Sequence, residues 1–265
     1  MENVKIAIIG GGNLGLSIAD GFISSEEIDN GNVTITKRNI TPISGLAEHG
    51  LHITQDNVEA VSNSDIILIV VKPYDVKDVL IEINPVLESN KHTIVSLATG
   101  ISIEEMEGYL DKEVSVFRAM PNIATDIRES ITCICNNGVA EEEKEKVHWV
   151  FDQLGASVDI NEDLMEAATI LGACGIAYVL RFVRAMIQGG IQIGFDSNTA
   201  SKIVGQTVKG AADLMIARNE HPEQLIDKVT TPKGCTIVGL NEMEHQGFSS
   251  SLIKGIVTSF ERIEK

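Results

Sequence analysis

Three glycines near the start of the chain have the type and spacing that bind a dinucleotide. Gly10, Gly12 and Gly15 fill the three positions of a G-x-G-x-x-G pattern within IAIIGGGNLGLSIA. The first glycine permits a tight turn, the second lets a pyrophosphate approach the backbone, and the third lets helix and strand pack closely. The helix that follows offers free N–H groups and the positive end of its dipole to the phosphates. A tight turn without any ligand is the alternative.

The surrounding residues supply the context that this motif needs. Residues 4–9 form a short apolar run typical of a buried strand, and Leu14, Ile18 and Phe22 then recur at helical spacing. A glycine pattern between a strand and a helix is the arrangement in which it indicates a dinucleotide site. We therefore expect the cofactor to contact the residues of the turn: Gly10, Gly12, Asn13, Leu14 and Gly15.

Two adjacent cations follow the second predicted strand, residues 33–36. An enzyme that uses NAD usually has an acid here for the ribose 2′-hydroxyl, whereas a 2′-phosphate requires positive charge. The chain has Lys37, Arg38 and Asn39, and no acid. This pattern predicts a preference for NADP(H), and a solvated basic turn is the alternative.

Two later strands should end at the same edge of the sheet, which borders the ligand crevice in open α/β folds. Lys72 and Pro73 close the strand at residues 65–71, and Lys72 either contacts the cofactor ribose or is merely exposed. Ala98 begins the loop after the strand at residues 93–97, where small residues would let a nicotinamide ring lie against the backbone. An ordinary loop is the alternative for this second segment.

A second candidate anion site lies far along the chain, at TTPKGCT, residues 230–236. Hydroxyl groups, a proline and a glycine stand just before a helical pattern. A carboxylate could accept from the free N–H groups of that helix, and Thr236 would add a hydroxyl. A plain helix cap is the alternative.

The predicted elements divide the chain into two parts. The first part alternates strands at residues 4–9, 33–36, 65–71, 93–97, 114–117, 131–134 and 156–160 with helices that include residues 43–49 and 141–154. Ser102 and Glu105 form a capping-box pattern at another helix start. Alternating strands and helices imply a parallel, doubly wound sheet. After residue 161 the pattern is helical, mainly at residues 162–170, 175–192, 197–217 and 239–263.

We therefore predict an α/β fold with two domains. Residues 1–161 should form a Rossmann-like, doubly wound and mainly parallel sheet that binds NADP(H), and residues 162–265 an all-helical domain. Residues 163–180 are apolar almost all round, which suggests a helix buried between domains or subunits.

Composition narrows the classes of function. The 265 residues are 43% hydrophobic with a net charge of −17, which supports a real core and disfavours binding to nucleic acid or to an anionic membrane. The cysteines and histidines show no metal-ligand spacing, so we expect no metal and buried thiols at Cys133 and Cys135. We also expect no signal peptide, no apolar stretch of membrane-spanning length, and a cytoplasmic location.

Several segments together resemble the pyrroline-5-carboxylate reductase family over nearly the whole chain. IGGGNLG, VVKP, SLATGISI and FRAMPN are similar to successive elements of that family, and QTVKGAA is similar to one of its helices. The most specific likeness is TTPKGCT, preceded by HPEQL, to the family's HP-x-x-L and SPGGTT signature.

The resemblance implies an activity, a domain arrangement and roles for individual residues. The family reduces the C=N bond of 1-pyrroline-5-carboxylate to L-proline, the last step of proline biosynthesis, with NADPH or NADH. It has a helical C-terminal dimerisation domain, and its active site forms between domains with help from a second subunit. The likeness implies that Thr236 hydrogen-bonds the ring nitrogen, while Thr231 and the backbone of Gly234 and Cys235 hold the carboxylate. The implied cofactor contacts are Asn57, Val70, Val71, Lys72, Pro73 and Ala98.

The departures from the family pattern cluster on the substrate side. SGSGPAY of the family reads GACGIAY at residues 172–178, and the glycine pair of SPGGT reads Lys233 and Gly234. Two alternatives therefore stand beside the leading hypothesis. One is a related reductase of another small imine or carboxylate, and the other is an NADP-binding sensor without catalysis.

Overall fold

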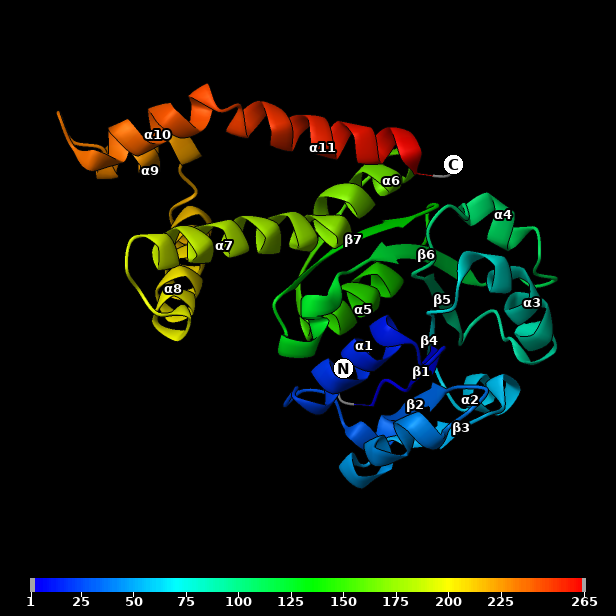
Figure 1. The fold of residues 1–265 in the computed structure, drawn as a ribbon. Coiled ribbons are helices and arrows are strands. Elements are labelled where there is room, and N and C mark those ends of the chain that lie inside the picture. The colour runs from blue at the N-terminus through cyan, green and yellow to red at the C-terminus, as the bar shows by residue number, and fades with distance from the viewer. Residues whose placement is uncertain (1–2, 264–265) are drawn as a thin grey trace. The chain divides into compact units, whose positions relative to one another are not determined.

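The computed structural model describes residues 3–263, which divide into two compact units. One unit comprises the chain up to Cys174 together with Ile263, and the other spans Gly175–Arg262. The first unit holds all the strands of the described residues (Figure 1).

The first unit is built on one eight-stranded sheet with the strand order β3-β2-β1-β4-β5-β6-β7-β8. Strands β1 to β6 run parallel to one another, β7 is antiparallel to β6, and β8 is parallel to β7. The strands are β1 Ile6–Ile9, β2 Val33–Thr36, β3 His52–Thr54, β4 Ile66–Ile69, β5 Thr93–Ser96, β6 Ser115–Met120, β7 Ser130–Asn136 and β8 Gly155–Asp159. The predicted doubly wound, mainly parallel sheet is therefore confirmed.

Helices cover both faces of this sheet, as β1 shows directly. Ile6 and Ile8 point into one core with Phe22 of α1 and Phe151 of α5. Ala7 and Ile9 point into the other core with residues of α2, α3 and α4. Since successive side chains of a strand face opposite ways, a strand buried on both faces must be apolar throughout. The helices of this unit are α1 Asn13–Ile23, α2 Asn57–Ser62, α3 Pro73–Ile83, α4 Ile103–Glu107, α5 Glu141–Asp152 and α6 Met165–Ala168.

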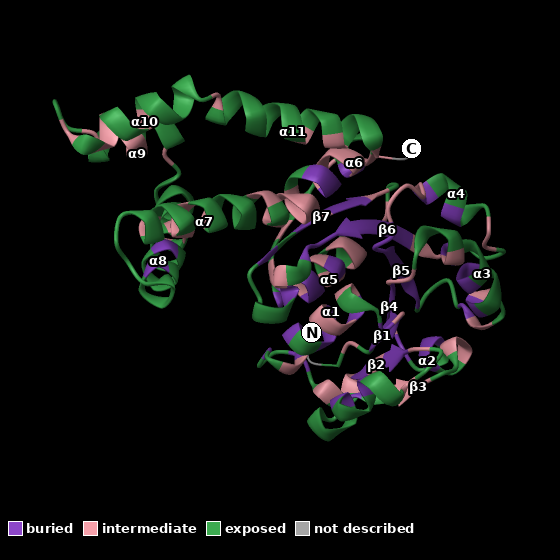
Figure 2. Ribbon diagram, viewed as in Figure 1, coloured by how far each residue is buried: buried purple, intermediate pink, exposed green. Residues whose placement is uncertain are grey.

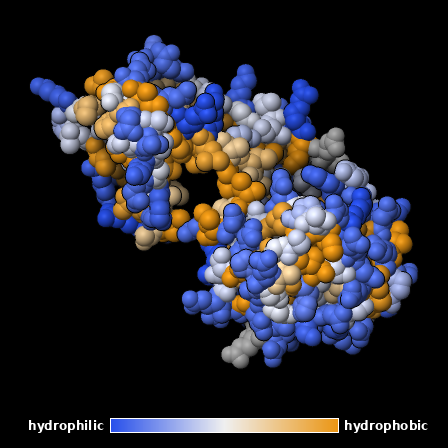
Figure 3. All heavy atoms as spheres, turned by 60° about the horizontal axis from the view of Figure 1, so that its bottom comes forward, coloured by the Kyte–Doolittle hydropathy of each residue, from blue (hydrophilic) through white to orange (hydrophobic). Residues whose placement is uncertain are grey.

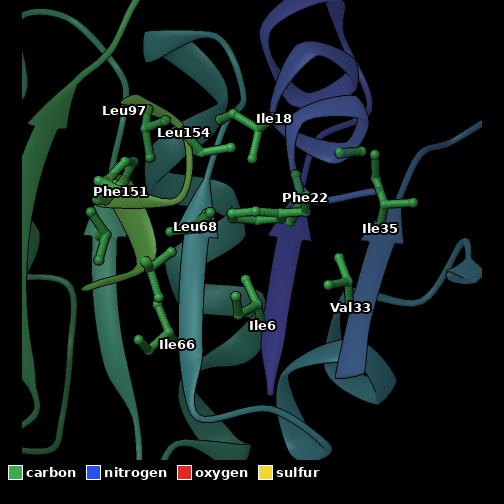
Figure 4. Packing of buried hydrophobic residues seen from close by; sticks show 14 of the residues in the cluster. Ile6, Ile18, Phe22, Val33, Ile35, Ile66, Leu68, Leu97, Phe151 and Leu154 are labelled. Atoms are coloured by element: carbon green, nitrogen blue, oxygen red, sulfur yellow. The ribbon is translucent and has the colours of Figure 1, made fainter. Parts of the chain in front are cut away.

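The packing of the first core explains why α1 is fixed so firmly against the sheet. Phe22 lies over the strands among Ile6, Ile35 and Leu68, with Ile18 one turn away (Figure 4). All five side chains are fully buried. Burial of a side chain of this size contributes roughly 1.5–3 kcal/mol, so the helix that follows the glycines is anchored over much of its length.

Some predicted elements differ from those observed. The helix expected at residues 43–49 is a 3-10 helix at Thr41–His49. The mainly helical segment predicted at residues 239–263 consists of two helices, which Gly247 separates with a φ of 80°. Strand β3 and helix α2 have no counterpart in the sequence reading. Cys135 is buried as expected, but Cys133 is only half-buried.

The second unit contains α7 Gly175–Gln192, α8 Ser197–Arg218, α9 Pro222–Val229, α10 Cys235–His245 and α11 Phe248–Arg262. Of its described residues, only Ala200 and Val204 are buried (Figure 2). Helices α7 and α11 are joined by a hydrogen bond from the Tyr178 hydroxyl to Ser259 Oγ, 2.8 Å long. Many large apolar side chains of this unit lie at its surface (Figure 3), so it leaves an unusually large apolar area uncovered.

The expectation that no stretch reaches membrane-spanning length is wrong. A continuous helical run at residues 162–192 includes an 18-residue window with a mean hydropathy of 1.7, and only 6% of that window is buried. Within the run, residues Thr169–Cys174 form a π-helix. A single helix of this kind is weak evidence for a membrane segment, because helices that pack on other protein surfaces have the same composition.

Candidate functional site: a glycine cradle and a threonine turn

The three motif glycines each meet a different steric requirement. Gly10 has a φ of 118°, and a Cβ atom added there would lie 2.7 Å from the carbonyl oxygen of Val70. A Cβ on Gly15 would lie 2.1 Å from the carbonyl oxygen of Gly10. A Cβ on Gly12, in contrast, would meet nothing within 4 Å. Gly10 and Gly15 are thus required by packing, whereas Gly12 faces open space.

The open space at Gly12 has the chemistry of an anion site. Gly12 is the N-cap of α1, no side chain caps the helix, and its first turn carries no acid. The first N–H groups of a helix have no partner within it, and Asn13 and Leu14 are the first residues of this one. Residues and space here fit the diphosphate of a dinucleotide.

The end of β2 lies directly beside this cradle. The amide of Gly11 donates to the carbonyl oxygen of Thr36 over 2.7 Å, and the aliphatic part of Lys37 lies close to Gly11. The Arg38 side chain is 89% exposed and its Nη2 lies 3.1 Å from Asp75 Oδ1. Asn39 has a local role, because its Oδ1 accepts from the amide of Thr41. Lys37 and Arg38 are therefore available where a ribose 2′-phosphate would require positive charge.

Asn57, the first residue of α2, is held in place on both sides of its amide. Its Oδ1 accepts from the Thr36 hydroxyl over 2.7 Å, and its Nδ2 donates to Glu82 Oε2 over 2.9 Å. Since an amide has two N–H donors, one remains beyond the bond to Glu82. The structure thus places Asn57 at the same sheet edge as the cradle.

The remaining predicted cofactor residues follow β4 and β5. The amide of Val70 bonds to the carbonyl oxygen of Ile9 over 2.8 Å, so this segment runs alongside the glycine loop. Lys72 is the exposed N-cap of α3 and Pro73 its first residue. Ala98 is buried, and its amide donates to Ser96 Oγ. Strands β2 and β4 lie on opposite sides of β1, so the residues that follow these three strands flank a topological switch point. Ala98 follows β5, the next strand along the same edge.

The second motif forms a tight turn at the start of α10. The amide of Gly234 donates to the carbonyl oxygen of Thr231 over 2.9 Å, and Lys233 has a φ of 61°, in the left-handed region. A Cβ on Gly234 would lie 2.6 Å from Thr231 Oγ1 and 3.0 Å from the carbonyl oxygen of Thr231, so a larger residue there would force the Thr231 side chain to move. Cys235 and Thr236 are the first two residues of α10, which has neither a side-chain cap nor an acid in its first turn. We call residues 231–236 the threonine turn.

Burial makes Cys135 of β7 a poor nucleophile. The pKa of Cys135 is raised to about 11, first by burial and then by the nearby carboxylate of Glu162. Since the thiolate is the reactive form of cysteine, Cys135 is a core residue. Burial also raises the pKa of Cys133.

Three residues near the cradle were missed by the sequence reading: Thr36, Asp75 and Glu82. Thr36 orients Asn57, as does Glu82, and Asp75 pairs with Arg38. Asp75 lies in the first turn of the helix after β4, so its position at the ligand edge was a signal available in the sequence.

The chain matches known proteins along its entire length. The family model described as pyrroline-5-carboxylate reductase dimerisation matches residues 162–265, and the one described as NADP oxidoreductase, coenzyme F420-dependent, matches residues 5–100. Pyrroline-5-carboxylate reductase 1 of Dictyostelium discoideum is 43% identical over 97% of this chain, which spans only 49% of that relative. Pyrroline-5-carboxylate reductase 2 of the same organism is 40% identical, with 100% of this chain and 93% of the relative covered.

Comparison with a solved structure agrees with these sequence matches. Pyrroline carboxylate reductase of Plasmodium falciparum, solved with NADP bound, superposes with a TM-score of 0.88 at 27% identity, covering 99% of this chain and 97% of the other. The chain that carries the glycine cradle and the threonine turn thus aligns over 97–100% of its length with proteins named as pyrroline carboxylate or pyrroline-5-carboxylate reductases. The chain belongs to the pyrroline-5-carboxylate reductase family.

Proposed function

We propose that the protein reduces the C=N bond of 1-pyrroline-5-carboxylate with NADPH to form L-proline, the last step of proline biosynthesis. The supporting observation is that two helix N-termini, at the glycine cradle and at the threonine turn, carry neither a side-chain cap nor an acid. They occur in a chain that matches reductases of this name over its whole length. One uncapped terminus suits a diphosphate and the other a substrate carboxylate.

The cofactor is held by the residues at the carboxyl edge of the sheet. Backbone amides of the cradle bind the diphosphate, Lys37 and Arg38 the 2′-phosphate, and Asn57 a ribose hydroxyl. The bound NADPH supplies the hydride; NADH is the other cofactor that this edge would accept. The remaining contacts proposed are Asn39, Val70, Val71, Lys72, Pro73 and Ala98.

The threonine turn binds and orients the substrate. The amides of Gly234 and Cys235, with the Thr231 hydroxyl, hold the carboxylate. The Thr236 hydroxyl donates to the ring nitrogen, because an imine accepts hydride well only when its nitrogen is hydrogen-bonded or protonated. Thr236 is half-buried. Its hydroxyl is therefore partly shielded from water but still accessible to a ligand.

We assign the two functions to residues 1–161, as the NADP(H)-binding domain, and residues 162–265, as a substrate and dimerisation domain. A homodimer or larger homo-oligomer through the C-terminal helices would cover the exposed apolar surface. That surface includes a groove of about 490 Å³ between α7 and α11, lined by Phe182, Phe248 and Leu252. A cytoplasmic location agrees with four unpaired cysteines.

A related reductase of another small imine or carboxylate is the second candidate. It is favoured by Lys233, a cation within the turn at a position where the family signature has glycine. A sensor that binds NADP without catalysis is the third candidate.

One experiment separates these candidates. The protein should reduce NADP⁺ at alkaline pH when L-proline is added, and other cyclic or N-alkyl amino acids should be poorer substrates. Faster turnover with another amino acid would favour the second candidate. Tight binding of NADP⁺ without turnover of any of them would favour the third.

A further inference from the structure

An ion pair connects the two sides of the glycine cradle. Arg38 follows β2, and Asp75 is the third residue of α3, which follows β4. Since β2 and β4 are the two neighbours of β1, a contact between these residues spans the turn after β1. Arg38 Nη2 lies 3.1 Å from Asp75 Oδ1. The structure therefore brings a carboxylate to the guanidinium that the sequence assigns to a 2′-phosphate.

The two side chains differ in how much of them is accessible. The Asp75 side chain is 26% exposed, whereas that of Arg38 is 89% exposed. A guanidinium has five N–H donors, and among the described residues only Asp75 accepts from the Arg38 guanidinium. The other donors are free to meet a ligand while Asp75 stays beside it.

We propose that Asp75 is a specificity-determining residue that opposes Arg38 in the choice between NADPH and NADH. This inference rests on the proposed use of a nicotinamide dinucleotide. A 2′-phosphate next to Arg38 brings negative charge toward the Asp75 carboxylate, which disfavours NADPH. A ribose hydroxyl instead donates to a carboxylate, as acids at the end of β2 do in NAD enzymes. Here the acid comes from α3.

A purely structural role for Asp75 makes a different prediction. An acid in the first turn of a helix stabilises that helix through its dipole. Loss of that effect would destabilise the start of α3 and weaken NADP⁺ and NAD⁺ binding alike. The ratio of the two dissociation constants therefore distinguishes specificity from simple stabilisation.

The test is calorimetric titration of NADP⁺ and NAD⁺ into the wild type and Asp75→Asn, without substrate. We expect Asp75→Asn to raise the ratio Kd(NAD⁺)/Kd(NADP⁺) about tenfold, the effect of one charged contact. Arg38→Ala should lower the ratio, and the double variant should lie between the two. Asp78→Asn is the matched control, because it removes the same charge from the same helix at an exposed position; its ratio should equal that of the wild type.

The titrations also separate the failure of this inference from that of the proposed function. If the wild type binds neither dinucleotide, both are overturned. If it binds them but Asp75→Asn leaves the ratio unchanged or lowers it, only the role of Asp75 is overturned. Asp75→Ser, which retains a polar group in the first turn, serves as a second variant should Asp75→Asn fold poorly.

Discussion

A Cβ atom on Gly15 would lie 2.1 Å from the carbonyl oxygen of Gly10. Gly15→Ala therefore cannot be accommodated unless α1 moves away from the loop that follows β1. Overpacking against a backbone atom typically costs 1–3 kcal/mol, and the anchoring of α1 by Phe22 leaves little freedom to adjust. We expect Gly15→Ala to lose about 2 kcal/mol or more in urea unfolding.

Gly12→Ala is the matched variant, since its Cβ would project into open space. Its stability should change by less than about 1 kcal/mol, while the methyl group would occupy the position where a pyrophosphate approaches. We expect NADP⁺ affinity to fall at least about tenfold by calorimetry. Unchanged affinity would remove the cradle from the cofactor site.

Lys233 should tolerate glycine because its φ of 61° lies in the left-handed region. Non-glycine residues there carry a cost of order 1–3 kcal/mol, partly offset by the greater entropy of unfolded glycine. Lys233→Gly should therefore be at least as stable as the wild type in urea unfolding, and Lys233→Val about 1–2 kcal/mol less stable. A Lys233→Gly variant less stable than Lys233→Val would contradict the turn geometry.

Arg118 should be far more important for stability than Arg38. Its side chain is 4% exposed and contacts Glu162 over 3.2 Å and Glu166 over 2.9 Å. Removal of Arg118 leaves both carboxylates without their cation, and because the Glu162 and Glu166 side chains are 34% and 17% exposed, the expected loss is about 2 kcal/mol. Arg38→Ala, at an exposed pair, should cost less than about 1 kcal/mol. Similar losses for the two variants would refute this distinction.

His92 should make the protein sensitive to mild acid. It is 2% exposed, and burial lowers its pKa, with Lys91 adding to the effect. The unfolded chain then binds more protons than the folded one below about pH 6.5, so stability is present above that pH and is lost as the pH falls. Glu88 and Asp65 act in the opposite direction.

The variant His92→Asn isolates the contribution of His92 to the pH dependence of stability. The Nδ1 atom of His92 accepts from the amide of Glu88 over 2.9 Å, and Asn could supply an oxygen acceptor without titrating. The urea midpoint should fall less between pH 8 and pH 5.5 in His92→Asn than in the wild type. An identical fall in both proteins would show that other groups cause the acid sensitivity.

The sequence alone predicts those parts of the fold that depend on the pattern of neighbouring residues. Residues 66–69 are apolar throughout and form a strand buried on both faces, and Ser102 accepts from the Glu105 amide as its capping pattern predicts. Strand β3 was missed because it has three residues, with polar His52 and Thr54 at its ends, too short for any periodicity.

Contacts between distant residues could not be predicted from spacing. Arg38 and Asp75 are 37 positions apart, and Arg118 and Glu162 are 44 apart. Pairing of such residues depends on strand order, which periodicity does not determine. The left-handed backbone conformation of Lys233 could not be predicted either, because this conformation is typical of glycine and not of lysine.

Reduction of 1-pyrroline-5-carboxylate by NADPH, measured with the wild type and with Thr236→Ala, tests both the proposed reaction and the role of Thr236. The wild type should oxidise NADPH and form an equal amount of L-proline. Thr236→Ala should lower kcat by at least about tenfold with little change in NADPH affinity, because it removes a hydrogen bond to the reacting nitrogen, and Thr236→Ser should recover most of the rate. A wild type that binds NADPH but forms no L-proline would contradict the proposed reaction.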